Sequence, residues 1–183
     1  IGGYHPAKLR RYQEMIDAYI APEMQAAMQA IAAKNGNMQE VDGAKVFPVL
    51  NMLNTKYFIL PLQGGATMPL QNIYAQGNGW FVDKINYVAD ANAEYAGVGK
   101  IDVRHEAVAD KKFESVLGKA QSNDSTAIVK LVKYEPNNLQ YTIESKKGGV
   151  VVFAEIYYPG WTATIDGQPA ELGRVNYILR AVS

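Results

Sequence analysis

The segment Val150–Ile165, VVVFAEIYYPGWTATI, carries the strongest structural signal in this 183-residue chain. Its first seven residues are almost continuously apolar, which is typical of a strand buried on both faces of a sheet. After a Pro-Gly turn, apolar residues alternate with threonines, as in a strand with one wet face. Asp166-Gly167 follows, and this dipeptide is a strong signal for a tight hairpin. The segment therefore predicts a central strand followed by a hairpin.

The sequence on either side extends this β region. Residues 127–134 are rich in β-branched side chains, and 139–143 alternate apolar and polar residues across a turn. Both patterns are typical of strands at the surface of a sheet. In all, we expect further strands at 56–60, 73–75, 80–88, 127–134, 139–143 and 175–182, and a short helix at 90–98.

The first third of the chain predicts helices. Apolar residues recur every three or four positions from Leu9 to Ile20, which places them on one helix face. Pro22 is expected to end this helix and to open the next, which Asn35-Gly36 terminates. A short helix is expected at 48–53. The chain is therefore predicted to be α+β, with N-terminal helices followed by a mainly antiparallel β-sheet or β-sandwich.

Three segments follow from these patterns: a helical segment at 1–55, a mixed α/β segment at 56–125 and an antiparallel β region at 126–183. We expect them to pack together as one or two subdomains. Both ends of the chain have the character of cut ends, because the sequence opens without methionine and stops directly after a strand-like run.

Composition excludes several classes of function. Basic and acidic residues number 18 each, and this balance argues against nucleic acid as a partner. The absence of cysteine excludes disulfides, thiolate metal sites and cysteine nucleophiles. No stretch reaches the roughly 18 consecutive apolar residues that a membrane-spanning helix needs.

The search for catalytic residues finds little. The two histidines, His5 and His105, are 100 positions apart and have no metal-binding spacing, so neither a metal site nor a cofactor is expected. Glu155 and Asp166 are the one carboxylate pair that suggests sugar chemistry. Asp166 is a routine turn former, and Glu155, within an apolar strand, needs either exposure at a sheet edge or a partner such as Arg174 or Arg180. A structural role is favoured for both carboxylates.

Two groups of residues are candidates for binding. Tyr158 and Trp161 flank the Pro-Gly turn near Glu155, where exposed aromatic rings could stack on sugars; the alternative is that Trp161 anchors the hairpin in the core. His5, Lys8 and Arg11 share one face of the first predicted helix and could hold an anionic head group; the alternative is an ordinary solvated face.

Four blocks of the sequence, in order, resemble YfhO-like bacterial membrane proteins. The blocks are GGYHPAKLRRYQ at 2–13, LNMLNTKYFI at 50–59, GNGWFV at 77–82, and EIYYPGW at 155–161 followed by IDG at 165–167 and NYILRAV at 176–182. They span nearly the whole chain, and none is a catalytic motif. In the third block the family more usually has alanine at the position of Gly79.

The resemblance implies a multispanning protein related to C-type glycosyltransferases, which take sugars from polyprenyl-phosphate carriers at the outer face of the cytoplasmic membrane. Their catalytic acidic residues lie in the transmembrane part, so no catalytic position maps onto this chain. The sequence would then be an extracytoplasmic (periplasmic) domain of such a glycosyltransferase, anchored in the membrane through its parent protein.

We therefore expect a non-catalytic domain that packs over the transmembrane part of the parent protein and helps to bind a glycan acceptor or a lipid-linked sugar. Two alternatives remain. One is a structural or assembly domain that contacts a partner protein. The other is a self-contained enzyme that acts on glycans.

Overall fold

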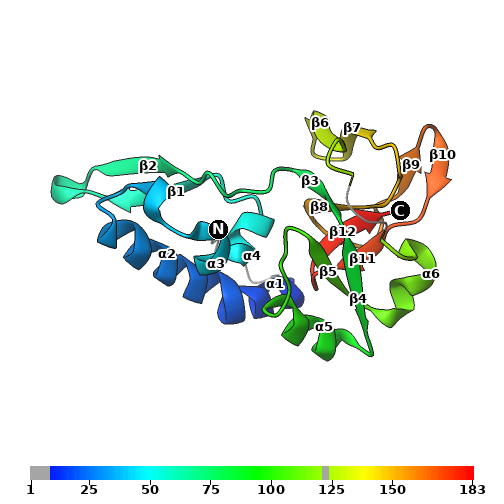
Figure 1. The fold of residues 1–183 in the computed structure, drawn as a ribbon, viewed down its shortest axis with the longest axis horizontal. Helices are drawn as coiled ribbons and strands as arrows, with labels where there is room; N and C mark the ends of the chain where they lie inside the picture. Colours follow the sequence, from blue (N-terminus) through cyan, green and yellow to red (C-terminus); the bar gives the residue numbers. More distant parts are fainter. Residues whose placement is uncertain (1–8, 121–123) are drawn as a thin grey trace. The chain divides into compact units, whose positions relative to one another are not determined.

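The computed structural model describes residues 9–120 and 124–183, and it divides into two compact units. Unit 1 comprises residues 1–51 and 55–74, and unit 2 comprises 52–54 and 75–183. Helices followed by mainly antiparallel strands confirm the α+β class (Figure 1). The structure groups residues 56–74 of the mixed segment with the helices, and it groups the described residues from 75 onward with the C-terminal β region.

Unit 1 begins with a helical stretch that continues through Pro22. It consists of α1 (Arg10–Met15), a π-helical turn (Ile16–Ile20) and α2 (Ala21–Ala33). The predicted break at Pro22 is therefore wrong. Proline has no backbone N–H to donate, but the wider π turn places Pro22 in the first turn of α2, where no backbone donor is needed. The predicted stop is confirmed, because Gly36 has φ 82° and its N–H bonds to the Ile31 carbonyl.

The remainder of unit 1 packs a hairpin on short helices. These elements are a 3₁₀ turn (Met38–Glu40), α3 (Gly43–Val46), α4 (Pro48–Met52), β1 (Tyr57–Pro61) and β2 (Thr67–Gln71), with a 3₁₀ turn (Gln63–Gly65) between the two strands. Helix α4 and strand β1 confirm the predictions, while β2 was not anticipated. Phe47 is fully buried and meets Phe58 and Tyr74 edge to face, at ring-centre distances of 5.2 and 6.2 Å.

Glu23 of α2 holds the start of α4. Its two carboxylate oxygens accept the backbone N–H groups of Val49 and Leu50, at 3.1 and 2.9 Å. These donors belong to the first turn of α4 and have no partner within the helix. Burial raises the pKa of the Glu23 carboxyl to about 7, although both N–H groups favour the charged form.

We expect unit 1 to lose stability as the pH rises from about 4.5 to 7. The pKa of Glu23 is raised in the folded state, so the folded chain binds more protons than the unfolded chain over this range. The loss should be about 1–3 kcal/mol, because one pKa unit corresponds to ~1.4 kcal/mol and Glu23 is only partly buried. Urea unfolding at pH 5 and pH 8 measures it.

Glu23→Gln should flatten this pH dependence, because the amide does not titrate. Glu40→Gln, at an exposed glutamate of the same unit, should retain the wild-type slope. Equal slopes in Glu23→Gln and the wild type would contradict the assignment.

Unit 2 is built on a four-stranded antiparallel sheet with the order β11-β12-β8-β3. The predicted central strand, β8 (Val150–Ile156), lies between two neighbours, and its first four residues are buried. Strand β3 (Gly79–Val82) forms one edge, with Trp80 opposite Val152.

The closing run 175–182 is not the single strand that was expected. It contains the end of β11 (Gly173–Val175), a turn, and β12 (Leu179–Val182), which pair as a hairpin. The reversal occurs at Asn176 and Tyr177, whose φ angles of 49° and 70° are left-handed. Tyrosine seldom adopts this conformation, so its presence gave no signal of a turn, and the apolar pattern of 175–182 predicts one continuous strand.

Two smaller hairpins confirm their predictions. Asp166 and Gly167 both have positive φ and join β9 (Ala163–Ile165) to β10 (Gln168–Ala170) in a two-residue turn. The second hairpin is formed by β6 (Ile128–Glu135) and β7 (Asn138–Glu144).

A parallel β-α-β unit is the main departure from the predicted antiparallel pattern. The expected strand 80–88 divides into β3 and β4 (Lys84–Val88), the expected strand 73–75 is a turn, and 90–98 forms α5 (Ala91–Val98) as predicted. Strand β5 (Glu106–Asp110) then pairs parallel to β4. A 3₁₀ turn (Lys111–Phe113) and α6 (Glu114–Leu117) follow.

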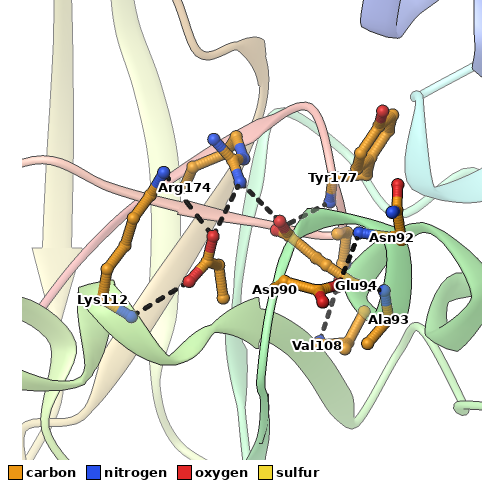
Figure 2. Close-up of polar contacts among 10 residues, drawn as sticks. Asp90, Asn92, Ala93, Glu94, Val108, Lys112, Arg174 and Tyr177 are labelled. Carbon is orange, nitrogen blue, oxygen red and sulfur yellow. Dashed lines mark hydrogen bonds and ion pairs between the residues drawn. The ribbon is translucent and has the colours of Figure 1, made fainter.

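A buried ionic cluster joins the β-α-β unit to the four-stranded sheet (Figure 2). Glu94 of α5 is fully buried, and its carboxylate accepts a hydrogen bond of 2.5 Å from the Arg174 guanidinium of β11. Its other oxygen accepts the backbone N–H of Tyr177 at 3.1 Å. Asp110, at the end of β5, lies 4.0 Å from the same guanidinium. The cluster places α5 and β5 against the β11–β12 hairpin.

Asn176 makes a second connection to the β-α-β unit. Its side-chain oxygen accepts the N–H of Val108 at 2.9 Å, and its own N–H donates to the Val108 carbonyl at 2.7 Å. Strand β5 is thereby hydrogen-bonded to the turn of the hairpin as well as to β4.

Glu94→Gln should lower the unfolding free energy of unit 2 by about 3 kcal/mol, because it leaves a buried guanidinium without its partner charge. Urea unfolding followed by tryptophan fluorescence measures the change, since both tryptophans belong to unit 2. Glu171→Gln removes an exposed glutamate and should change stability by no more than about 0.5 kcal/mol. Similar small losses in both variants would show that the pair is not a structural connection.

Candidate functional site

Unit 2 contains a cleft of about 280 Å³ beside strand β3. This volume is close to the lower end of the range for small-molecule sites, which is ~300–1,000 Å³. Three parts of the unit contribute to its walls: β3, the loops before β4 and β5, and the base of the β6–β7 hairpin. The lining residues are Gly79, Trp80, Phe81, Asp83, Arg104, His105, Asp124, Ala127, Val129 and Gly148.

Strand β3 supplies the aromatic part of the cleft, Trp80 and Phe81, both partly buried. Gly79 allows β6 to approach closely, because a Cβ at this position would lie 2.8 Å from a methyl group of Val129. Alanine at this position would require Val129 to shift. Phe81 and Val129 also pack against the core formed by Val151, Phe153 and Val182.

An Asp–His pair forms the polar wall. Asp83 lies between β3 and β4, and its carboxylate is 2.9 Å from Nδ1 of His105. The backbone reinforces this contact, because the Asp83 N–H donates to the His105 carbonyl at 2.7 Å. A carboxylate can only accept a hydrogen bond, so Nδ1 of His105 carries the proton in this contact. Whenever the ring is neutral, its Nε2 is then an acceptor.

Asp124 organises the loops at the base of the β6–β7 hairpin. One oxygen accepts the N–H and the hydroxyl of Thr126, at 3.0 and 2.6 Å. The other accepts the N–H of Lys146 at 2.7 Å and the Ser145 hydroxyl at 3.3 Å. These donors, with the Thr126 hydroxyl foremost, hold the pKa of Asp124 well below its usual range. Asp124 is therefore a fixed negative charge with both oxygens occupied.

Two donor groups of the lining residues have no side-chain partner among the described residues. The indole Nε1 of Trp80 is buried and finds no hydrogen-bond partner among the described residues. A buried donor without a partner lowers the stability of the folded state. The exposed side chain of Arg104 adds a guanidinium at the same cleft.

The aromatic residues proposed from the sequence lie elsewhere in unit 2, at the end of β8. Tyr158 is 53% exposed. Trp161 is partly buried, and the Arg180 guanidinium lies 4.0 Å from the centre of its ring. Arg180 also donates to the Ile156 carbonyl at 2.8 Å. Neither aromatic residue is among those that line the cleft.

Glu155 is also outside the cleft lining and lies near Arg180. Burial raises the pKa of the Glu155 carboxyl, and the Arg180 charge opposes this effect. Of the two arginines considered as partners for Glu155, Arg180 is the one that acts on it, while Arg174 pairs with Glu94.

Of the basic candidates near the N-terminus, the structure describes Arg11, which belongs to unit 1. Arg11 is a partly buried residue of α1, whereas His5 and Lys8 lie outside the described residues.

Sequence reasoning missed the cleft because its residues come from loops that are far apart in the chain. Trp80 was assigned to a strand, and His105 was considered only as a metal ligand. In the described residues, no group of three or more His, Asp or Glu side chains could hold a metal ion. A tryptophan and phenylalanine directly after a glycine-rich turn were the signal that could have indicated a ligand site.

Comparisons of the chain with protein-family models, with curated proteins and with solved structures find no match. Within 9–120 and 124–183, no helix is long and apolar enough to cross a membrane.

Proposed function

We propose that this chain is a non-catalytic glycan-binding domain and that the cleft beside β3 holds one sugar residue. The observation that carries the proposal is the composition of the cleft. Trp80 offers an apolar ring on which a sugar can stack, while Phe81 packs against the core, and Asp83, Arg104 and His105 offer hydrogen-bonding groups around the ring. Sugar rings need both, because they present C–H faces and a rim of hydroxyl groups.

The chemistry of the cleft favours binding over bond breaking. Among its described lining residues there is no hydroxyl or thiol that the Asp83–His105 pair could activate as a nucleophile. Asp124 is unsuited to proton transfer, because its pKa is far below neutral pH and both oxygens already accept hydrogen bonds.

The resemblance to YfhO-like proteins supplies the cellular context of the proposal. One of its four blocks, residues 77–82, includes the three β3 residues that line the cleft. We infer that the domain belongs to a membrane glycosyltransferase and lies on the extracytoplasmic face of the cytoplasmic membrane. Its role would be to hold the acceptor glycan or the lipid-linked sugar near the catalytic residues of the transmembrane part.

The two tryptophans of the chain distinguish the cleft from the surface around Tyr158. Trp80→Leu should weaken binding of a glycan selected on an array by about tenfold, because it removes the ring on which the sugar stacks. Trp161→Leu should bind as the wild type does. Isothermal titration calorimetry gives the affinities, and urea unfolding checks that both variants fold.

The opposite pattern, with binding lost in Trp161→Leu and kept in Trp80→Leu, would move the site to the Tyr158–Trp161 surface. No binding of any arrayed glycan by the wild-type chain would contradict the proposed function.

One observation favours the alternative, an assembly domain. Residues 57–82 contain no charged residue or histidine, although a fifth of the whole chain is charged. Within this run, the β1–β2 hairpin exposes Tyr57, Ile59, Leu62 and Met68, which are 40–55% accessible to solvent. An uncharged apolar surface of this kind is suited to an apolar partner, and the transmembrane part of the parent protein is the partner we propose.

Cross-linking in the membrane-embedded parent protein tests this alternative. A photoreactive residue at Ile59 should cross-link to the transmembrane part, because the hairpin would lie against it. Ile128 is equally exposed on β6 and is the matched control, expected not to cross-link. Equal yields at both positions, or none at Ile59, would exclude the hairpin as the contact.

A further inference from the structure

We propose that the sugar bound in the cleft is acidic, and that Arg104 binds its carboxylate or phosphate group. This inference rests on the proposed glycan-binding function and specifies the class of sugar. It is carried by the position of Arg104 at the cleft and by its difference from the other two arginines of unit 2, Arg174 and Arg180.

The guanidinium of Arg104 has no partner in the described part of the chain. The short turn before β5 holds its backbone, because the Arg104 N–H donates to the Asp102 carboxylate at 3.1 Å. Within 9–120 and 124–183, no hydrogen bond, ion pair or ring contact engages the side chain itself. By contrast, Arg174 pairs with Glu94, and Arg180 bonds to the Ile156 carbonyl and stacks on an indole ring. Arg104 is thus an uncommitted cation at the edge of a cleft.

The two carboxylates of the cleft do not neutralise this cation. Asp83 is engaged by His105 at 2.9 Å, and Asp124 is engaged by the hydroxyl and N–H donors around it. Their negative charges disfavour an anion placed deep in the cleft. An acidic ligand is therefore favoured in the orientation that directs its charged group toward Arg104.

The chemistry of guanidinium selects the ligand group. Its planar fork of N–H donors matches the paired oxygens of a carboxylate or phosphate, and such charge-assisted hydrogen bonds are stronger than neutral ones. The sugar ring would then occupy the space beside Trp80.

The test compares three probes with one ring: glucose, glucuronate and glucose 6-phosphate, titrated into the full chain and followed by nuclear magnetic resonance. We expect at least one of the two acidic sugars to bind about tenfold more tightly than glucose, and the preferred one identifies the anionic group. Arg104→Ala should abolish this preference, because it removes the cation that binds the anionic group. Lys100→Ala removes an exposed positive charge outside the cleft and should keep the preference.

Four results would overturn the inference. If glucose binds as tightly as both acidic sugars, the proposed glycan site is retained but its proposed selectivity for acidic sugars is contradicted. A preference that survives Arg104→Ala would assign the anion to another residue. If inorganic phosphate binds as tightly as glucose 6-phosphate, the site recognises the anion and not the sugar. Binding of none of the three sugars would overturn both this inference and the proposed glycan site.

Discussion

The buried pair between Glu94 and Arg174 is the interaction on which the arrangement of unit 2 depends. It joins a helix of the parallel β-α-β unit to the last hairpin of the antiparallel sheet, two parts of the chain 80 residues apart. Removing one partner from such a pair lowers the free energy of unfolding by far more than the intact pair contributes to it. Both residues are therefore needed together. The position of the loop that carries His105 follows from it, because that loop leads directly into β5.

The cleft is a consequence of this arrangement. Strand β3 belongs to the four-stranded sheet, whereas Asp83 and His105 precede the two strands of the β-α-β unit. Fixing β5 to the hairpin through Asn176 therefore sets the distance between the polar wall and Trp80. Asp124 does the same for the third wall by joining the loops at both ends of the β6–β7 hairpin. A preformed cleft reduces the entropy lost on binding.

Local signals in the sequence predicted much of the fold. Strand β8, the Asp166-Gly167 turn and the Asn35-Gly36 stop were predictable because each depends on residues adjacent in sequence. The parallel pairing of β4 with β5 was not, because it joins segments more than 15 residues apart through a helix. The cleft was missed for the same reason. Trp161 stood out beside its turn, whereas Trp80 becomes notable only once His105 lies near it.

The central claim is that the cleft beside β3 binds glycans, and amide chemical-shift mapping tests it most directly. The ¹⁵N-labelled chain would be titrated with the glycan that binds most tightly on an array. We predict that the largest amide shifts occur at Trp80, His105 and their neighbours. These shifts should all follow the same binding curve as the glycan concentration rises. Shifts concentrated at Tyr158 and Trp161, or on the β1–β2 hairpin, would contradict it.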